Sequence, residues 1–233
     1  LLTEIKGSAE TSLIARRLLA ALSEPISLMN QDILVTTSIG ITLAPDDTDD
    51  PNILMKNADL AMYRAKELGR NNYQFYTEEM NVEALGRLFL ENELRQAIEQ
   101  EQFVLHYQPQ LNLADNSTKG VEALIRWSHP ERGVIPPEHF INVAEETGQI
   151  VAVGRWVIKE ACRQAKELQD NGNRLSMAIN LSARQFADPE LPTIIEQVLE
   201  ETSIDPSLIE FEITESMLMD NIEEAIETLH RLK

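Results

Sequence analysis

The order of apolar and polar residues divides the chain into two parts. In the first part, apolar residues recur every three or four positions over residues 8–23 and predict an amphipathic helix. Residues 33–43 are rich in β-branched side chains and predict a strand. A second helix is expected to begin at Pro51, with Asp50 as its N-cap, and to stop at Gly69.

In the second part, strands alternate with helices. A heavily charged amphipathic helix over residues 81–101 comes first and is interpreted as a connector. Strands are then expected at residues 103–113, 121–127, 176–181 and 209–214, with helices between them and a last helix at 221–233. Alternation of this kind indicates an α/β fold in which crossover helices join parallel strands.

Charge and composition limit the classes of function. The 233 residues include 20 Lys+Arg and 39 Asp+Glu, for a formal net charge of −19, and 43% are hydrophobic. The chain is therefore globular, and no nucleic-acid polymer is expected as a partner because such a surface needs a basic stripe. No run of about 18 apolar residues exists. The single cysteine, Cys162, lies in a helical segment and is expected to be a buried thiol in a reducing compartment, so we expect this segment to be cytoplasmic.

Residues 121–127 combine a carboxylate and a guanidinium on one strand. Because side chains alternate along a strand, Glu122, Leu124 and Arg126 lie on one face and the apolar residues between them on the other. A carboxylate is a ligand for a hard cation, and an arginine can hold a phosphate through two parallel hydrogen bonds. The pair suggests metal-assisted chemistry on a phosphate ester.

Two further strands place an oxygen ligand where they end. Glu122, Asn180 and Glu212 follow three successive apolar strands, whose carboxyl ends meet at one edge of a parallel sheet. Each residue alone has a structural interpretation, because an Asn there often forms a turn and a Glu often caps a helix. Their repetition favours a site for Mg²⁺ or Mn²⁺ over Zn²⁺, since the set contains no sulfur or imidazole.

These segments resemble the EAL domain of cyclic di-GMP phosphodiesterases. The matching motifs, in chain order, are Tyr107-Gln108-Pro109, Glu122-Ala123-Leu124-Ile125-Arg126-Trp127, Pro136-Pro137-Glu138-His139-Phe140-Ile141, Ala144-Glu145-Glu146-Thr147-Gly148, Asn180-Leu181-Ser182 and Glu212-Ile213-Thr214-Glu215-Ser216. So many ordered segments over about 130 residues make a chance similarity very improbable.

The resemblance implies metal-dependent hydrolysis of one phosphodiester bond of cyclic di-GMP, which gives linear pGpG. Glu122, Asn180 and Glu212 would bind metal in a two-metal site. Arg126 would hold the phosphate and Gln108 would help to seat the substrate. Glu215 would belong to the catalytic set by steadying a loop beside the site, although it could also cap the following helix.

The first part of the chain is similar to the C-terminal half of a GGDEF, or diguanylate cyclase, domain. The similarity rests on Ser38-Ile39-Gly40-Ile41 and on Ala58-Asp59-Leu60-Ala61-Met62-Tyr63-Arg64-Ala65-Lys66-Glu67-Leu68-Gly69-Arg70-Asn71. In that family Lys66 and Arg70, one helical turn apart, would contact the phosphates of bound GTP. The alternative is a solvated helix end whose cations favour the helix dipole.

We therefore expect parts of two domains from a longer, dimeric bacterial signalling protein. Residues 1–80 would be the C-terminal half of the GGDEF domain, 81–101 the connector helix, and 102–233 the N-terminal half of the EAL domain. The fold class would be α/β, a truncated (β/α)8 TIM-type barrel plus part of an α/β cyclase-like domain. A closed barrel needs about 250 residues. The remaining metal ligands would lie beyond Lys233, and the isolated segment is expected to be poorly stable and inactive.

Three functions remain open for the longer protein. It could be an active phosphodiesterase, or a degenerate EAL receptor that binds cyclic di-GMP without cutting it. It could also be a diguanylate cyclase with a regulatory EAL domain and GTP as its substrate. The residues before Leu1 and after Lys233, where a membrane anchor or a sensory domain could also lie, would separate these alternatives.

Overall fold

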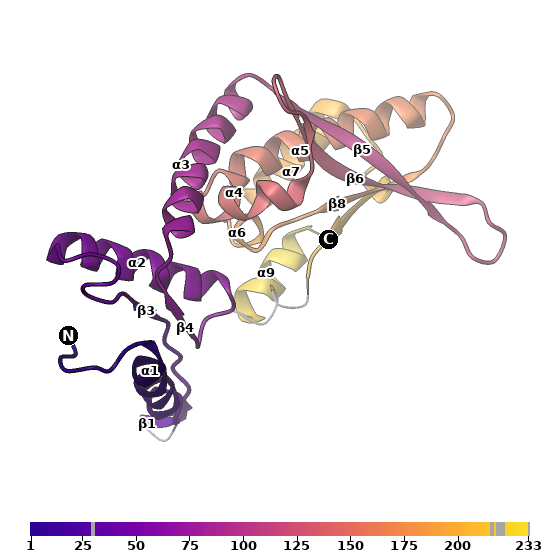
Figure 1. Cartoon of the computed structure of the whole chain (residues 1–233). Helices are drawn as coiled ribbons and strands as arrows, with labels where there is room; N and C mark the ends of the chain where they lie inside the picture. Colours follow the sequence, from indigo (N-terminus) through magenta and orange to yellow (C-terminus); the bar gives the residue numbers. More distant parts are fainter. Residues whose placement is uncertain (29–30, 215–216, 218–221, 233) are drawn as a thin grey trace. The chain divides into compact units, whose positions relative to one another are not determined.

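The chain folds into two compact units, residues 1–88 and residues 89–233 (Figure 1). The computed structural model describes residues 1–28, 31–214, 217 and 222–232. One helix, α3 (Glu78–Glu99), begins in the first unit and ends in the second. Among the described residues, no helix is long and apolar enough to cross a membrane. Each unit is described by itself below.

The first unit contains two small sheets and two helices. Its elements are α1 (Ser8–Leu22), β1 (Ile26–Leu28), β2 (Gln31–Ile33), β3 (Ile39–Ile41), α2 (Pro51–Glu67) and β4 (Tyr73–Phe75). β1 and β2 pair antiparallel, whereas β3 and β4 pair parallel. The strand expected over residues 33–43 is wrong in its extent. β-Branched composition favours an extended chain, but a strand also needs a partner for its hydrogen bonds, and residues 34–38 are not part of a ladder.

Helix α2 has the boundaries that its sequence predicts. The Asp50 carboxylate accepts a hydrogen bond from the backbone N–H of Asn52 at 2.8 Å, and Pro51 is the first helical residue. Gly69 follows the helix with φ at +99°, a conformation that favours glycine. A Cβ at Gly40 of β3 would lie 1.9 Å from the carbonyl oxygen of Ala58, so this strand and α2 pack backbone against backbone.

The second unit is built on a sheet whose strand order is β5-β6-β8-β9, with β7 added along β6. After the end of α3, its elements are β5 (Phe103–Leu111), β6 (Thr118–His129), β7 (Gly133–Ile135), η1 (Pro137–His139), α4 (Ile141–Thr147), α5 (Ile150–Asp170), β8 (Ser176–Asn180), α6 (Ala183–Phe186), α7 (Leu191–Thr202), η2 (Pro206–Leu208), β9 (Ile209–Glu212) and α9 (Ile222–Leu232).

Strands β6, β8 and β9 are parallel, and helices join them along the chain. The predicted α/β class is therefore confirmed. The first strand departs from the parallel pattern, because β5 runs antiparallel to β6. Residues 112–117 join these two strands, and so short a connection makes a hairpin, whereas a parallel crossover needs a dozen residues or more. The hairpin is visible as the long pair of arrows in Figure 1.

The core of this unit lies between one face of the sheet and the helices that cover it. Val121, Ala123 and Trp127 of β6 are buried. Met177 and Ile179 of β8, which pair with Val121 and Ala123, are buried on the same face. Their partners come from α4, α5 and α7. Complete burial of a large apolar side chain stabilises a fold by about 1.5–3 kcal/mol, so this face fixes how the strands sit against the helices.

Cys162 lies in this core on α5, and its thiol is not part of a disulfide. Its side chain is 1% exposed, and burial raises the pKa of the thiol to about 11. The prediction of a buried thiol is confirmed.

We expect Cys162 to be protected from thiol reagents in the folded protein. A pKa of about 11 leaves much less reactive thiolate near neutral pH than an ordinary cysteine has, so labelling near pH 8 should be at least about a hundredfold slower in the folded protein. The measurement compares the rate of disulfide exchange with an aromatic disulfide reagent in buffer and in guanidinium chloride. Equal rates in the two solvents would contradict the buried position.

Candidate active site

The predicted site residues of the second unit lie on one face of its sheet. Glu122 is opposite Ala178 of β8 and Gln108 of β5, and Asn180 is opposite Glu212 of β9. Because side chains alternate along each strand, Gln108, Glu122, Asn180 and Glu212 point to the same side, away from the helix-covered core. The sheet therefore brings together four residues that are up to 104 positions apart, from Gln108 to Glu212.

A hydrogen bond joins two of these residues directly. The side-chain amide of Asn180 donates from Nδ2 to Oε1 of Glu122 at 2.7 Å. Glu122 is half-buried, whereas Asn180 and Glu212 are exposed. Asn180 and Glu212 lie at the carboxyl ends of their strands, as predicted, although the strands stop one and two residues earlier than expected, whereas Glu122 lies in the middle of β6. The difference arises because β6 continues beyond its parallel pairing with β8 and pairs antiparallel with β5 and β7 as far as His129.

Arg126 lies on the same face, four residues after Glu122. Its guanidinium is half-buried and donates from Nη1 to the carbonyl oxygen of Ile125 at 2.8 Å. An arginine has five N–H donors, so this contact leaves it the capacity for a two-pronged interaction with a phosphate. Gln108 is exposed on β5, directly across from Glu122.

The chemistry of the proposed donor set suits a hard cation. Glu122, Asn180 and Glu212 offer two carboxylates and one amide, which are oxygen ligands of the kind that Mg²⁺ and Mn²⁺ prefer. The hydrogen bond between Asn180 and Glu122 shows that two of these side chains converge. Within the described ranges, no three His, Cys, Asp or Glu side chains are grouped so that they could hold a metal ion. Glu215, the other acidic candidate, lies outside the described residues.

The two cations predicted in the first unit do not lie on one helical turn. Lys66 is in the last turn of α2, but the helix ends at Glu67 and Arg70 has φ at +58°. The Arg70 backbone N–H bonds to the carbonyl oxygen of Ala65 at 3.2 Å in the turn that Gly69 permits. The expected spacing of Lys66 and Arg70 is therefore wrong, since the helix stops between them. Both side chains are exposed.

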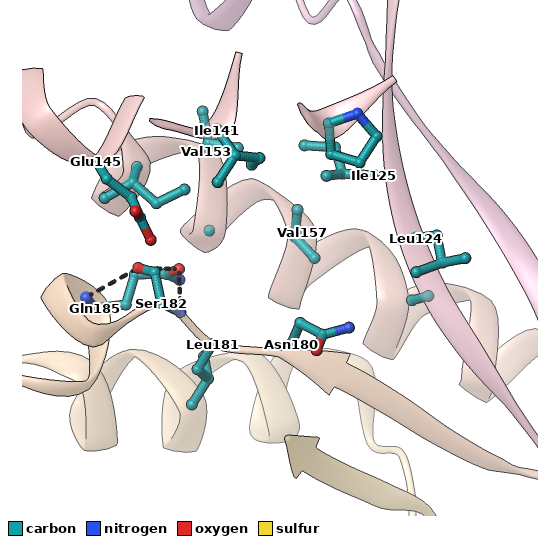
Figure 2. A pocket seen from close by; sticks show the side chains of 14 residues that line it. Leu124, Ile125, Ile141, Glu145, Val153, Val157, Asn180, Leu181, Ser182 and Gln185 are labelled. Carbon is teal, nitrogen blue, oxygen red and sulfur yellow. Dashed lines mark hydrogen bonds between the residues drawn. The ribbon is translucent and has the colours of Figure 1, made fainter. Parts of the chain in front are cut away.

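A cavity of about 270 Å³ opens beside the middle of β6 and the end of β8 (Figure 2). Apolar side chains form most of its wall, and Glu145, Asn180, Ser182 and Gln185 supply the polar groups. Figure 2 shows the carboxylate of Glu145 directed toward Ser182 and Gln185. Asn180 therefore belongs both to the proposed metal-binding face and to the wall of this cavity.

Sequence reasoning missed Glu145 as a site residue. A signal was present, because Glu145 lies in one of the motifs that resemble the EAL domain. Its place at the cavity depends on how α4 packs against the β8–α6 loop. The spacing of residues along the sequence does not show that α4 packs there.

Arg184 of α6 connects its helix to α4, the helix that carries Glu145. Its guanidinium donates from Nη1 to the carbonyl oxygens of Glu145 at 2.7 Å and Glu146 at 3.2 Å. These carbonyls belong to the last turn of α4, which ends at Gly148 in the left-handed conformation, and the Gly148 N–H also donates to the Glu145 carbonyl at 3.3 Å. Arg184 thus ties the end of α4 to α6 and limits where Glu145 can lie.

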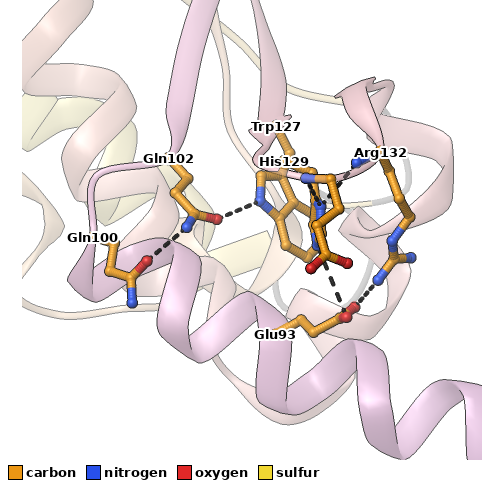
Figure 3. Close-up of polar contacts among 7 residues, drawn as sticks. Glu93, Gln100, Gln102, Trp127, His129 and Arg132 are labelled. Carbon is orange, nitrogen blue, oxygen red and sulfur yellow. Dashed lines mark hydrogen bonds and ion pairs between the residues drawn. The ribbon is translucent and has the colours of Figure 1, made fainter.

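A polar network holds the far end of β6 (Figure 3). The indole N–H of Trp127 donates to Oε1 of Gln102 at 3.1 Å. His129 accepts at Nδ1 from two backbone N–H groups of the following turn, and its Nε2 is 3.8 Å from the carboxylate of Glu93 on α3. The same carboxylate pairs with Arg132. The strand that carries Glu122 and Arg126 is therefore fixed to the second half of α3.

The match to known families agrees with this arrangement. The EAL domain family matches residues 91–233, and the family described as "Diguanylate cyclase, GGDEF domain" matches residues 1–72. The chain belongs to the EAL domain family, and its first part is a GGDEF domain segment. The families predicted from the sequence motifs are confirmed.

Several relatives match nearly all of this chain and are themselves longer. The chain is 41% identical over all of its residues to the bifunctional diguanylate cyclase/cyclic di-GMP phosphodiesterase MucR of Pseudomonas aeruginosa, of which it covers 34%. It is 42% identical over 97% of its residues to the signaling protein YkoW of Bacillus subtilis, of which it covers 28%. Over 94% of its residues it is 41% identical to the cyclic di-GMP phosphodiesterase PdeR of Escherichia coli, of which it covers 33%. The chain thus spans about a third of the length of these relatives.

Solved structures show the same fold. The MucR phosphodiesterase in complex with c-di-GMP is 43% identical, with a TM-score of 0.60 over 61% of this chain and 58% of that one. The FimX EAL domain of Xanthomonas citri, also in complex with c-di-GMP, is 25% identical, with a TM-score of 0.59 over 65% of this chain and 59% of that one. The predicted TIM-type barrel segment is confirmed by these neighbours.

We expect Arg184→Ala to destabilise the second unit by about 1 kcal/mol, because it leaves the last carbonyls of α4 without their charged donor. Denaturant unfolding measures the difference. Arg155→Ala is the matched control, since it removes an exposed arginine on α5 whose ion pair with Glu190 is 3.6 Å long and contributes less than about 0.5 kcal/mol. Equal effects of the two substitutions would show that Arg184 does not brace α4.

Proposed function

We propose that the protein containing this chain hydrolyses cyclic di-GMP to linear pGpG with Mg²⁺ or Mn²⁺. The observation that carries the proposal is the convergence of Glu122, Asn180 and Glu212 on one sheet face, next to Gln108 and Arg126. Support comes from relatives whose names give this activity and from EAL structures solved with c-di-GMP. Because the chain spans about a third of those relatives, the activity is proposed for the longer protein.

The three oxygen ligands would hold the metal. Glu122 would contribute its carboxylate, Asn180 its carboxamide oxygen and Glu212 the second carboxylate. A bound divalent cation polarises the phosphate and makes water a better nucleophile near neutral pH. For this the Asn180 amide must turn its oxygen toward the cation, and the hydrogen bond from Nδ2 to Glu122 is the contact that sets its starting orientation.

Arg126 and Gln108 would position the substrate. The chain carries a formal net charge of −19, so a phosphate diester needs a local cation to approach the sheet face. Arg126 would supply this charge and hold the two non-bridging oxygens of the scissile phosphate. Gln108, directly across the strand pair from Glu122, would donate to the substrate from the other side of the carboxylate.

The cavity beside Asn180 would hold a guanine base. Its apolar wall suits the flat faces of a purine, and the Glu145 carboxylate can accept hydrogen bonds from the two adjacent N–H groups on the Watson–Crick edge of guanine. Adenine has an acceptor in place of one of these donors, and that acceptor would be repelled by the carboxylate oxygen. Glu145 would therefore give the site its preference for guanine.

We expect Glu122→Ala to abolish hydrolysis in the longest natural open reading frame that contains this chain. Loss of residues that merely support a metal ligand typically costs 10- to 100-fold, so loss of a ligand itself should lower turnover by more than about a hundredfold. The measurement is chromatography of pGpG formed with Mg²⁺ or Mn²⁺, with Glu196→Gln, an exposed change on α7, as the control. If the folded wild-type protein binds cyclic di-GMP without turnover, the proposed hydrolytic activity is wrong and the protein is a receptor.

We expect Glu145→Gln to weaken the binding of cyclic di-GMP by about tenfold or more, because the new amide presents a donor to a guanine donor. Calorimetry on metal-free protein measures binding without turnover. Glu196→Gln again serves as the matched control. If the Glu145→Gln protein keeps its affinity for cyclic di-GMP, the guanine base does not bind beside Glu145.

A further inference from the structure

The main chain that leads out of Asn180 is short and tightly held. Leu181 alone separates Asn180, the last residue of β8, from Ser182, the N-cap of α6. The Leu181 N–H bonds to the carbonyl oxygen of Glu212 at 2.9 Å, and the Leu181 side chain is buried. A shift of the start of α6 must therefore move the backbone of Asn180, because the single linking residue is itself held in place.

Gln185 fixes the start of α6 through a capping box. The Ser182 hydroxyl accepts from the Gln185 N–H at 3.3 Å and donates to the Gln185 side-chain oxygen at 2.9 Å. The same oxygen accepts from the Ser182 N–H at 3.2 Å (Figure 2). Glutamine side chains in proteins are mostly exposed, but Gln185 is only 5% exposed. Burial makes its position depend on what it packs against.

Gly154 of α5 provides the space that Gln185 occupies. A Cβ at Gly154 would lie 1.6 Å from Nε2 and 2.3 Å from Cδ of Gln185. Gly154 lies inside a helix and has no positive φ, so its backbone does not require glycine. A glycine there costs about 1 kcal/mol relative to alanine. The fit of Gln185 is the physical reason that the structure gives for this glycine.

We propose that Gln185, seated against Gly154, is a positioning residue that holds Asn180 in its metal-binding place. The pair acts through the Ser182 cap and the short Leu181 link, and it sets the amide of Asn180 against Glu122. The proposal rests on the metal site of the proposed function. It makes α5, which carries none of the proposed ligands, part of the support of that site.

The test measures Mn²⁺ binding without nucleotide, by the electron paramagnetic resonance signal of free Mn²⁺, in the longest natural open reading frame that contains the chain. Gly154→Ala should displace Gln185 and weaken Mn²⁺ binding by about 10- to 100-fold, the usual effect of losing an outer support of a ligand. Gly86→Ala is the matched control, because Gly86 is also inside a helix but a Cβ there would meet nothing within 4 Å. It should leave Mn²⁺ affinity unchanged.

A second variant covers the case in which Gly154→Ala does not fold. Gln185→Ala removes the capping side chain without adding atoms, and it should weaken Mn²⁺ binding to a similar extent. If Gly154 acts through Gln185, the double variant should bind Mn²⁺ as the Gln185→Ala protein does, whereas independent effects would add. The non-additive result is one that a general loss of stability would not produce.

Three outcomes would overturn the inference in different ways. Folded variants with wild-type Mn²⁺ affinity would refute the positioning role while the wild-type protein still hydrolyses cyclic di-GMP. If the variants bind cyclic di-GMP more weakly without metal but keep their Mn²⁺ affinity, Gln185 and Gly154 only line the cavity and do not position Asn180. A wild-type protein that neither binds Mn²⁺ nor hydrolyses the dinucleotide would refute the proposed function as well.

Discussion

The register of the three parallel strands is the constraint on which the site depends. Glu122 pairs with Ala178, and Asn180 pairs with Glu212. A slip of one residue in β8 would turn Asn180 toward the helices and bring a buried apolar neighbour to the site face. The apolar residues of the opposite face resist that slip, since Met177 and Ile179 would lose their buried positions. The packing that stabilises the sheet thus also aligns the ligands.

The start of the parallel pairing is equally restricted. Gly120 of β6 is opposite Ser176 of β8, and a Cβ at Gly120 would lie 2.1 Å from the Ser176 hydroxyl. The two strands therefore approach closely where their pairing begins. At the other end of β6, Trp127 is fully buried and hydrogen-bonded to Gln102. Glu122 lies between these two anchors, so its half-buried carboxylate stands on a rigid part of the strand.

The sequence predicts the parts of the structure that depend on local chemistry. The caps of α2 follow from Asp50 and Gly69, and the site strands follow from apolar runs that carry Asn180 and Glu212 near their carboxyl ends. Features that depend on a partner far along the chain were not predicted. Residues 34–38 have strand composition but no place in a ladder, and Glu122 lies in mid-strand because β6 gains antiparallel neighbours.

The supporting residues were missed for the same physical reason. Glu145 and Gln185 are ordinary polar residues of two short helices, and only the packing of α4, α5 and α6 shows what they touch. A capping box can be read from Ser182 and Gln185, but its burial against Gly154 cannot, because those residues lie on different elements. Spacing identifies groups that share an element, whereas contacts between elements need the fold.

Electrostatics would connect the proposed metal with the proposed substrate in this arrangement. The proposed ligands Glu122 and Glu212 add two negative charges to a sheet face on an already acidic chain, and the dinucleotide adds two phosphates. Arg126 by itself cannot balance this charge. A divalent cation bound between the carboxylates would offset their two charges, and together with Arg126 it would leave a net positive charge that attracts the phosphate. Metal and substrate should therefore bind with positive coupling, and the placement of Asn180 by Gln185 would influence both.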